Sequence, residues 1–349
     1  MTAAVHSRQA VLNVLAPVVA VAAALVVGAG LLVLAGVHPF VAFKPLLLGG
    51  FSSRYGFTET LVKATPLLLV GLGIAIAFRG GVLNIGAEGQ LTVGAIMATA
   101  VALALPGLPL WVLLPLTMLT GFVAGALWGG LPGILKARLG VNEILTTIMM
   151  NAIALQLSSY LLRGPMIDPK EVAYGTGYPQ SAKIPQAAWL PRLVRQTRLH
   201  WGIPLALLVA VLVYIFLWRT TIGYRIRAVG ANAAASRYAG INVVGYMFLA
   251  MVLSGGMAGL AGAVEISGVH HRMLDGVSAG YGFSGIVAAL FGKLHPLGII
   301  PASVLFGALL VGADMMQRAT GVPAGLVNAM QGLVVMFVVA SELWQRRQG

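Results

Sequence analysis

Long apolar runs separated by short polar stretches dominate this chain. About ten runs have the roughly 20 residues that a helix needs to cross a hydrocarbon core about 30 Å thick. They begin near Val11, Thr58, Glu88, Leu110, Asn142, Trp201, Val243, Gly280, Ile299 and Val322. The pattern predicts an all-α, polytopic membrane protein of about ten transmembrane helices. No stretch between the runs is long enough for a large soluble domain, so residues 1–349 are expected to form a single transmembrane domain.

Composition supports the membrane assignment and narrows the partners. The chain is 59% hydrophobic and 9% charged, with a mean hydropathy of +0.92, whereas soluble domains average about 25% charged residues. The formal charge of +13 comes from cations spread over loops beside lipid, where anionic headgroups are the usual partner. No basic patch alternates with stacking aromatic residues, as it does in single-strand binders. We therefore expect membrane lipid, and no nucleic acid, as a partner.

The loops suggest two halves. Five apolar runs precede a polar loop at residues 163–200 and five follow it. An odd number of spans per half would give the halves opposite orientations, as in transporters built from inverted five-helix repeats with broken helices. Lys and Arg divide evenly between the two faces. Short basic connections near residues 136–138, 219–237 and 346–347 share one face, which favours a cytoplasmic N-terminus. Residues 163–200 are then extracytoplasmic and residues 220–242 cytoplasmic.

Polar residues interrupt one apolar segment in each half, at residues 78–90 and 265–284. Ionisable groups inside a membrane are costly and are expected to face a cavity or a partner. In the first segment, Asn84, Glu88 and Gln90 lie among glycines that let the backbone leave the helix. They are candidates for lining the substrate path, although a tight turn with Glu88 at a helix N-terminus is equally consistent. Asn151 is a further candidate, whereas Asn142 fits a helix N-cap.

The second interrupted segment contributes Glu265, Tyr281, Phe283 and Ser284 to the candidate substrate path. The two aromatic residues are flanked by glycine and can stack on a planar ligand, or belong to an interfacial aromatic belt. Adjacent histidines at positions 270 and 271 lack further ligands at suitable spacing, so no metal site is predicted. The chain has no phosphate-binding loop motif, and we predict no catalytic residue, no cofactor and no ATP hydrolysis by this chain.

A short basic segment at residues 220–242 separates two spans and is rich in small residues. Its small side chains permit close docking, its arginines offer charge pairing, and Asn232 can cap a short helix. The candidate docking residues are Arg225, Arg227, Gly230, Asn232, Arg237, Tyr238 and Gly240. The alternative is a basic loop that merely anchors two spans.

Four stretches together resemble a known family: FRGGVLNIGAEGQ (residues 78–90), VNEILTTIMMN (141–151), RAVGANAAASRYAGI (227–241) and GYGFSGIVAALFG (280–292). The chain is similar to permease subunits of bacterial ATP-binding cassette (ABC) importers in the branched-chain amino acid, ribose and nucleoside group. The nucleoside type is the nearest. Ribose-type permeases usually carry a different stretch, similar to GGIDLS, where this chain has residues 81–88.

The resemblance implies import of nucleosides or related sugars by alternating access across a bacterial inner membrane. It also implies that residues 227–241 form a coupling helix on a separate ATPase subunit. A second, non-identical permease chain and a periplasmic or lipoprotein solute-binding protein are the other implied partners. Two alternatives stay open from the residues alone. One is an ion-coupled secondary transporter that uses Glu88, Glu265 or Asp314, and the other is an intramembrane enzyme acting on a lipid-linked substrate.

Overall fold

The computed structural model describes residues 26–175 and 177–323, together with residues 23, 325–326, 329–330, 332–333 and 336–337. This described part is helical and contains no β-strand beyond two isolated bridges, which confirms the all-α prediction. The chain divides into two compact units, one comprising residues 1–60 and 307–349 and the other residues 61–306. The second unit contains every residue of the candidate substrate path and of the candidate docking segment.

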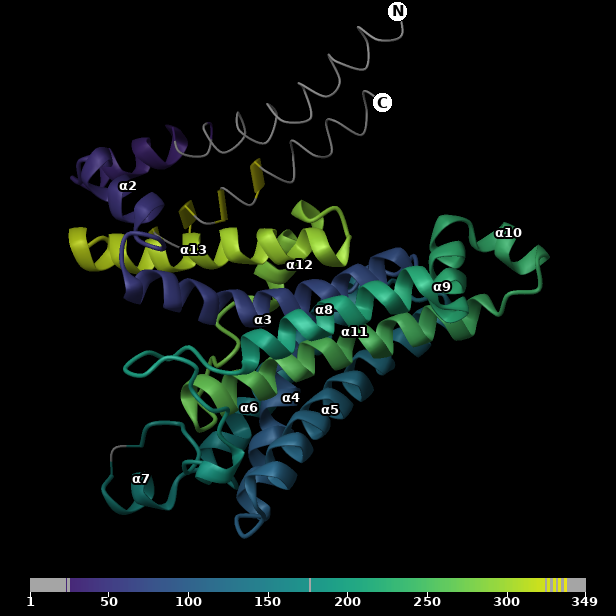
Figure 1. Cartoon of the computed structure of the whole chain (residues 1–349), viewed down its shortest axis with the longest axis horizontal. Helices are drawn as coiled ribbons and strands as arrows, with labels where there is room; N and C mark the ends of the chain where they lie inside the picture. Colours follow the sequence, from purple (N-terminus) through teal and green to yellow (C-terminus); the bar gives the residue numbers. More distant parts are fainter. Residues whose placement is uncertain are drawn as a thin grey trace, which may run out of the picture. The chain divides into compact units, whose positions relative to one another are not determined.

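Seven helices in the described ranges are long and apolar enough to cross a membrane, and Figure 1 labels them. They are α3 (Arg54–Arg79), α4 (Ala87–Ala104), α5 (Leu110–Leu139), α6 (Glu143–Arg163), α8 (Gly202–Arg219), α11 (Val243–Glu265), which continues into the π-helical turn η2 (Ile266–His270), and α13 (Pro296–Thr320). Each begins within a few residues of a predicted run. Seven of the predicted runs therefore form helices that are long and apolar enough to be spans.

The predicted total of ten spans is not confirmed. The span expected from Gly280 is wrong, because the helix there, α12 (Tyr281–Phe291), has only 11 residues and rises about 16 Å. It ends at a turn in which Lys293 and Leu294 both adopt positive φ, and Pro296 then starts α13. Apolar residues flank this turn on both sides, so the hydropathy pattern does not reveal it. The spans expected near Val11 and Val322 fall largely outside the described residues.

Shorter helices complete the described chain. They are α2 (Pro39–Leu48), α7 (Pro169–Ala173), the 3₁₀ turn η1 (Gln186–Ala188), α9 (Thr221–Ala231) and α10 (Ala233–Tyr238). In the first unit, α2 packs on the second half of α13 through buried Leu46, Ala42, Ala313 and Met316. That contact needs Gly312, because a Cβ at this position would overlap the carbonyl group of Leu46.

The second unit is built on a close three-helix core of α4, α5 and α11, which pack on one another. Glycines let these backbones touch. A Cβ built on Gly259 would lie 2.8 Å from the Cα of Gly125, and one built on Gly129 would lie 3.0 Å from the Cα of Gly255. Small residues at helix contacts are the usual device for close packing in lipid, where no hydrophobic effect drives helices together. This core holds the start of α4 in a defined position.

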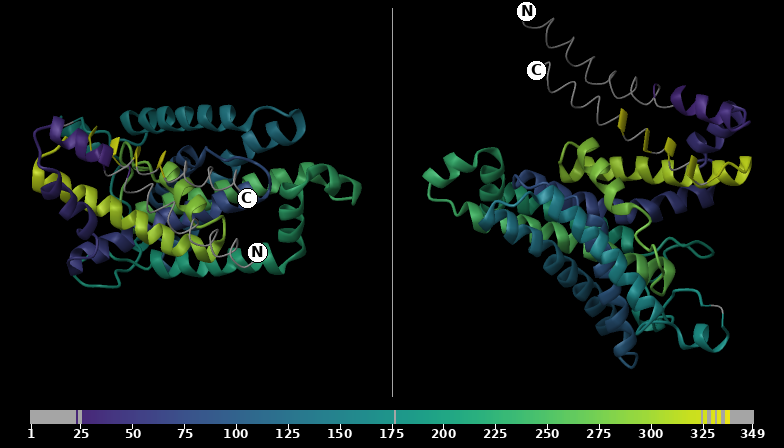
Figure 2. Two further views of the ribbon diagram at one scale, coloured as in Figure 1. Left: turned by 90° about the horizontal axis from the view of Figure 1, so that it is seen from above. Right: turned by 180° about the vertical axis from the view of Figure 1, so that it is seen from behind.

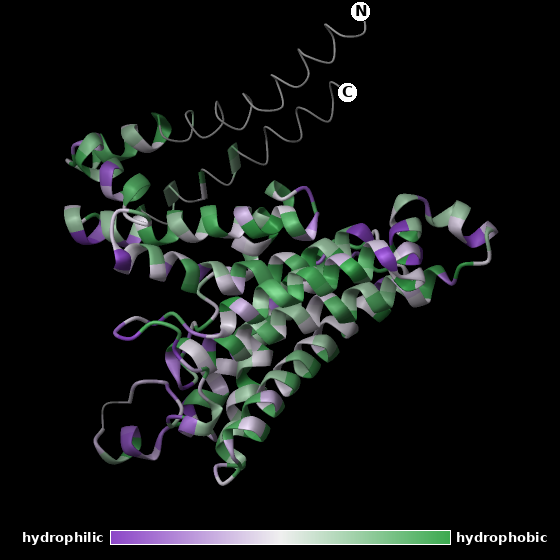
Figure 3. Cartoon of the chain, in the orientation of Figure 1, coloured by the Kyte–Doolittle hydropathy of each residue, from purple (hydrophilic) through white to green (hydrophobic). Residues whose placement is uncertain are grey.

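Two polar segments lie at opposite ends of α8. The loop at residues 163–200 enters α8, and α9 and α10 follow its other end, as both views in Figure 2 show. Figure 3 shows hydrophobic residues along the long helices, and hydrophilic residues around α7 and on α9 and α10. Because α8 is long and apolar enough to span a membrane, the prediction that the two segments lie on opposite sides of one is consistent with this arrangement. Which side is cytoplasmic stays a prediction.

Candidate functional site

The chain leaves the helical path between α3 and α4, in the first predicted interruption. Gly81 has φ of +76°, a conformation that residues with a Cβ rarely adopt. The following Asn84 is fully buried, and its side chain organises the loop. Its amide nitrogen donates to Gln90 Oε1 at 2.9 Å and to Ser254 Oγ at 2.8 Å, and its oxygen accepts from the Gly86 nitrogen at 2.9 Å. The loop is thereby tied to both α4 and α11.

Asn151 reaches the same place from α6. Its side-chain oxygen accepts a hydrogen bond from the Gly89 nitrogen at 2.8 Å, and its amide donates to the Ile85 carbonyl at 2.9 Å. Gly89 lies in the first turn of α4, where backbone N–H groups have no partner within the helix. Asn151 therefore caps α4 from a different helix. Asn142 caps its own helix, as predicted, by accepting from the Ile144 and Leu145 nitrogens.

Glu88 joins the two interrupted segments. It lies in the first turn of α4, and its carboxylate accepts from the Gly280 nitrogen at 3.0 Å and from the Gly282 nitrogen at 2.7 Å. These amides belong to the N-terminus of α12. A carboxylate between two helix N-termini is favoured by both helix dipoles. Gly282 permits the close approach, because a Cβ there would lie 2.5 Å from the Glu88 Cα.

These contacts define a polar junction, formed by Asn84, Glu88, Gln90, Asn151 and Ser254 together with the start of α12. Four of these residues were predicted from the sequence. Ser254 was missed as a site residue, because a serine in a Gly/Ala-rich helix carries no distinctive signal. The side chains are buried and bonded to one another or to backbone, so their chemistry suits holding the two breaks in a fixed geometry.

The remaining predicted path residues lie at the end of α11 and on α12. Glu265 is buried at the end of α11, with Oε2 3.5 Å from His270 Nε2. On α12, Tyr281 is buried, Phe283 is 49% exposed and Ser284 is partly exposed. The structure does not bring the two aromatic rings together, because positions two apart on a helix do not face each other. Of the three predicted path residues on α12, Phe283 and Ser284 keep accessible surface.

The loop at residues 163–200 docks on the second break. Backbone nitrogens of Ser181, Ile184 and Leu190 donate to the carbonyls of Met273, His271 and Ser267, each at 2.9 Å. The Trp189 ring stacks on His271 with 3.9 Å between centroids. Burial, with help from Arg192 and His270, lowers the pKa of His271 to about 4, so its ring is neutral near pH 7.

A second histidine, the last residue of this loop, is also neutral near pH 7. His200 is fully buried, and its Nδ1 accepts from the Gly202 nitrogen at 3.0 Å. Burial is the main cause that lowers its pKa to about 4, with a smaller contribution from His271. Within the described residues no group of His, Cys, Asp and Glu is arranged to hold a metal ion.

The predicted docking segment forms two short helices. Thr220 caps α9 by accepting from the Gly223 nitrogen, and Asn232 caps α10 by accepting from the Ala235 nitrogen at 2.9 Å. The cap at Asn232 breaks the helix and turns α10 away from α9. Residues 231–240 are exposed except for partly buried Ala233 and buried Ser236, and Tyr238 is 95% exposed. This stretch, the α10 tip, presents small residues around one accessible aromatic ring.

The arginines of this segment differ in their surroundings. Arg225 Nη1 donates to the Tyr246 hydroxyl at 2.9 Å, and Arg227 Nε donates to the Leu217 carbonyl at 2.9 Å. Both side chains are therefore directed at other parts of this chain. Arg237 is exposed on the α10 tip, beside Gly240 with φ of +76°. Of the three predicted pairing arginines, Arg237 alone has no contact that competes with docking among the described residues.

Gly230 connects the docking segment to the first break. A Cβ built on Gly230 would overlap the carbonyl oxygen of Arg79 and lie 2.8 Å from the Gly81 nitrogen. The end of α9 therefore rests directly on the backbone that leads to the polar junction. Ile226 and Val229, on the same helix, are buried.

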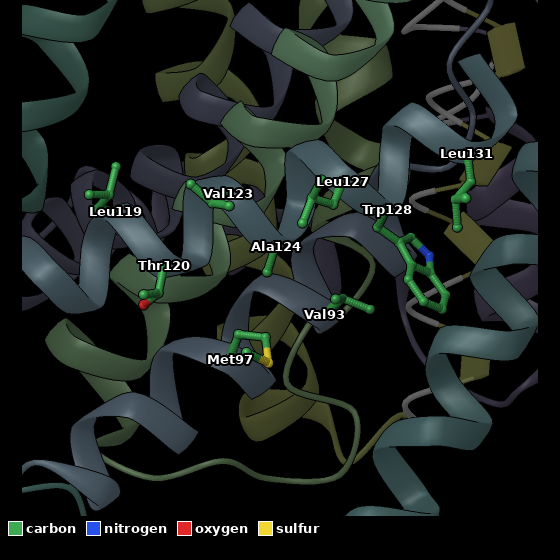
Figure 4. Close-up of a pocket in the computed structure, with 9 residues that line it drawn as sticks. All are labelled: Val93, Met97, Leu119, Thr120, Val123, Ala124, Leu127, Trp128 and Leu131. Atoms are coloured by element: carbon green, nitrogen blue, oxygen red, sulfur yellow. The ribbon is translucent and has the colours of Figure 1, made fainter. Parts of the chain in front are cut away.

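An apolar groove of ≈ 550 Å³ lies between α4 and α5, lined by the nine residues labelled in Figure 4. Its two polar groups are engaged elsewhere, because the Thr120 hydroxyl donates to the Leu116 carbonyl and Trp128 Nε1 donates to the Met150 carbonyl. The lining offers no directional partner to a polar solute. Its chemistry suits hydrocarbon, so we do not place the substrate path there.

Comparison with known proteins defines the class as ABC transporter permeases, the multi-pass membrane subunits of these transporters. The chain belongs to the family described as the branched-chain amino acid transport system / permease component, whose model matches residues 56–339. Permeases of this class work with ATPase and solute-binding partners.

Three curated relatives cover most of the chain. The glucose ABC transporter permease protein TsgB13 of Haloferax volcanii is 39% identical over 95% of this chain and 88% of its own length. The guanosine ABC transporter permease protein NupP of Bacillus subtilis is 38% identical over 94% of each chain. The nucleoside ABC transporter permease protein NupB of Lactococcus lactis is 33% identical over 93% of this chain and 90% of its own length. The family resemblance found in the sequence is confirmed.

Proposed function

We propose that this chain is the membrane-spanning subunit of an ABC importer that carries nucleosides, or chemically related sugars, across a bacterial inner membrane by alternating access. The single observation that carries the proposal is the position of α9 and α10. One end of this pair is an exposed tip of small residues, and the other end packs on the backbone of the first break through Gly230. A partner that moves the tip therefore acts on the polar junction.

The ATPase subunit is proposed to dock on the α10 tip through Tyr238, Arg237 and the flanking small residues. Tyr and Arg are enriched among the residues that contribute most of the binding energy at protein interfaces. Arg225 and Arg227 take a different role from the predicted one, because they hold α9 against Tyr246 and Leu217. They transmit the movement of the tip without contacting the motor.

The solute path is proposed to pass beside the polar junction, where the N-termini of α4 and α12 meet at Glu88. Broken helices that meet within the membrane form the substrate sites of many transporters. Asn84, Glu88, Gln90 and Asn151 position the breaks, while Phe283 and Ser284 offer accessible surface for a base and a hydroxyl group. Directional import requires that the two access states bind the solute unequally, and ATP supplies this difference through α10.

Several partners belong to the proposal. A second, non-identical permease chain completes the path, and a periplasmic or lipoprotein solute-binding protein delivers the solute at the loop of residues 163–200. That loop is hydrogen-bonded to the second break through the backbone of Ser181, Ile184 and Leu190. A delivering protein that binds the loop could therefore act on the segment that leads to α12. ATP is hydrolysed by the separate ATPase, and the permease chain makes no covalent change in the solute.

The substrate class is tested by uptake into proteoliposomes that contain the complete transporter. Labelled guanosine and cytidine, glucose, ribose and leucine are supplied outside, with ATP available to the ATPase. We expect ATP-dependent uptake of a nucleoside that excess unlabelled nucleoside suppresses and leucine does not. Uptake of leucine alone would contradict the substrate assignment. Uptake that persists without ATP and collapses with an ionophore would instead establish the ion-coupled alternative.

A further inference from the structure

Two guanidinium groups lie against a single tryptophan ring near the end of α8. The guanidinium carbon of Arg79 is 4.8 Å from the Trp218 ring centroid, and that of Arg227 is 5.3 Å from it. Arg79 ends α3, Arg227 lies on α9, and Trp218 lies in the last turn of α8. The His295 ring, 4.8 Å from Trp218 between centroids, completes the cluster from the turn after α12. Three helices and one turn therefore meet around two positive charges.

Both arginines are anchored by neutral groups. Arg79 Nε donates to the Leu294 carbonyl at 2.6 Å and its Nη2 donates to the Lys293 carbonyl at 3.4 Å, while Arg227 Nε donates to the Leu217 carbonyl. These bonds fix the position of each guanidinium group and leave its charge uncompensated. A guanidinium group has more N–H donors than these contacts use, so donors of fixed direction stay available on Arg227 in particular.

No carboxylate pairs with either arginine within the described ranges. Two acidic residues of the same unit have other partners. Glu143 pairs with Lys136 at 2.7 Å, and Glu88 accepts hydrogen bonds from the N-terminus of α12. Like charges that share a partly buried site repel each other, and this repulsion is relieved when an anion binds between or beside them. The exposed side chain of Lys293 adds positive charge at the same turn. The cluster therefore has the electrostatics of an anion site.

The cluster lies at the ends of two helices that are long and apolar enough to span a membrane. Two spanning helices, α3 and α8, end there at Arg79 and Arg219. The α8 side chains that precede it, Leu208, Leu212 and Ile215, are about half exposed, which is the pattern of a face turned to hydrocarbon. Tyr214 and Trp218 follow on the last turns of α8, stacked with 5.6 Å between centroids. Aromatic side chains at the end of a span are typical of the membrane interface.

We propose that Arg79, Arg227 and Trp218 bind the phosphate group of an anionic phospholipid, whose acyl chains lie along the exposed face of α8. Guanidinium groups bind phosphate through paired hydrogen bonds with fixed geometry, and basic pockets at helix ends are known to take lipid headgroups. This site requires no ATPase and no solute, so it goes beyond the transport function. A bound lipid joins the end of α3 to α9, beside the contact of Gly230.

The test measures lipid binding by the purified full chain in detergent, using native mass spectrometry with phosphatidylglycerol and phosphatidylcholine as probes. We expect retention of phosphatidylglycerol over phosphatidylcholine in the wild type. Arg227→Gln removes one positive charge from the cluster. We expect it to weaken phosphatidylglycerol binding about tenfold, which corresponds to the loss of one charge-assisted hydrogen bond. Arg219→Gln is the matched control, because Arg219 is exposed one residue beyond Trp218 and contributes no contact to the cluster.

Two further arms keep the proposal falsifiable if Arg227→Gln perturbs the fold. Arg227→Lys keeps the charge and removes the paired donors, and it is expected to weaken binding less than Arg227→Gln. Inorganic phosphate is added as a soluble competitor and is expected to displace no lipid at millimolar concentration. Equal loss in Arg219→Gln, unchanged binding in Arg227→Gln, or phosphate binding as strong as that of the lipid would each overturn the site. None of these readouts depends on nucleoside uptake or on an ATPase.

Discussion

The bond between Glu88 and α12 makes the sharpest prediction, because one side chain connects two helix N-termini. Glu88→Gln keeps the shape of the side chain and replaces one carboxylate oxygen by an NH₂ group. One of the two amides, at 3.0 Å for Gly280 or 2.7 Å for Gly282, then faces a donor. The loss of a charge-assisted hydrogen bond costs about 1.5–3 kcal/mol, and the loss of negative charge at helix N-termini costs about 0.3–1 kcal/mol more.

The total of about 2–4 kcal/mol corresponds to a roughly 30- to 700-fold rise in opening of the α12 N-terminus, since each 1.4 kcal/mol is a factor of about ten. Hydrogen–deuterium exchange of the full chain in nanodiscs measures this opening directly. The peptide covering residues 276–285 should exchange faster by about this factor. Glu171→Gln makes the same chemical change on α7, where the carboxylate contacts the Gln180 side chain, and it should leave that peptide unchanged. Equal protection of residues 276–285 in wild type and Glu88→Gln would refute the junction.

Three further variants test the contact at Gly230, the docking of the ATPase subunit and the pKa of His200. Gly230→Ala places a Cβ against the backbone of Arg79, an overpacking that costs about 1–3 kcal/mol, so uptake should fall while the chain still inserts. Gly30→Ala is the control, because nothing lies within 4 Å of a Cβ there, and it should transport normally. Equal uptake by both variants would remove Gly230 from the coupling path. Tyr238→Ala should weaken co-purification of the ATPase subunit about tenfold or more, and unchanged co-purification would move the docking site away from the α10 tip. Because the pKa of His200 is lowered to about 4 in the fold, its stabilising contribution is fully present above the unfolded-state pKa near 6.5 and is lost as pH falls toward 4. The thermal midpoint of the wild type should therefore fall more steeply over this pH range than that of His200→Gln. Parallel curves for the two proteins would contradict the lowered pKa.

Much of the helix layout could be predicted from the sequence, because apolar length alone fixes where a span begins. The starts of α5 and α11 match the predicted runs at Leu110 and Val243. The short helix α12 could not be predicted, because the turn that ends it consists of Lys293 and Leu294 in left-handed conformations, which neither residue type signals. Hydropathy therefore merged a short helix with the approach to the next span.

The sequence predicted which residues belong to the candidate site, but it did not predict which of them contact each other. The polar residues of the first break stood out because glycines surround them, and Asn84 and Gln90 do bond to each other. Glu88 meets Gly280 across 192 residues of chain, and no local pattern reports such a pairing. The direction of Arg227 was equally hidden, because a basic residue on a short helix can face a partner, lipid or its own chain. Only the position of Leu217 and Trp218 settles that it faces its own chain.

The absence of cysteine from this chain allows ATPase docking on the α10 tip to be tested directly. Tyr238→Cys places a single thiol on the α10 tip, where it can react with a membrane-impermeant maleimide or with a cross-linker to a partner. We predict that the thiol is labelled only from the cytoplasmic side, cross-links to the ATPase subunit, and is shielded when that subunit is bound. Labelling from the opposite side of the membrane, or no cross-link to the ATPase in an actively transporting complex, would contradict it.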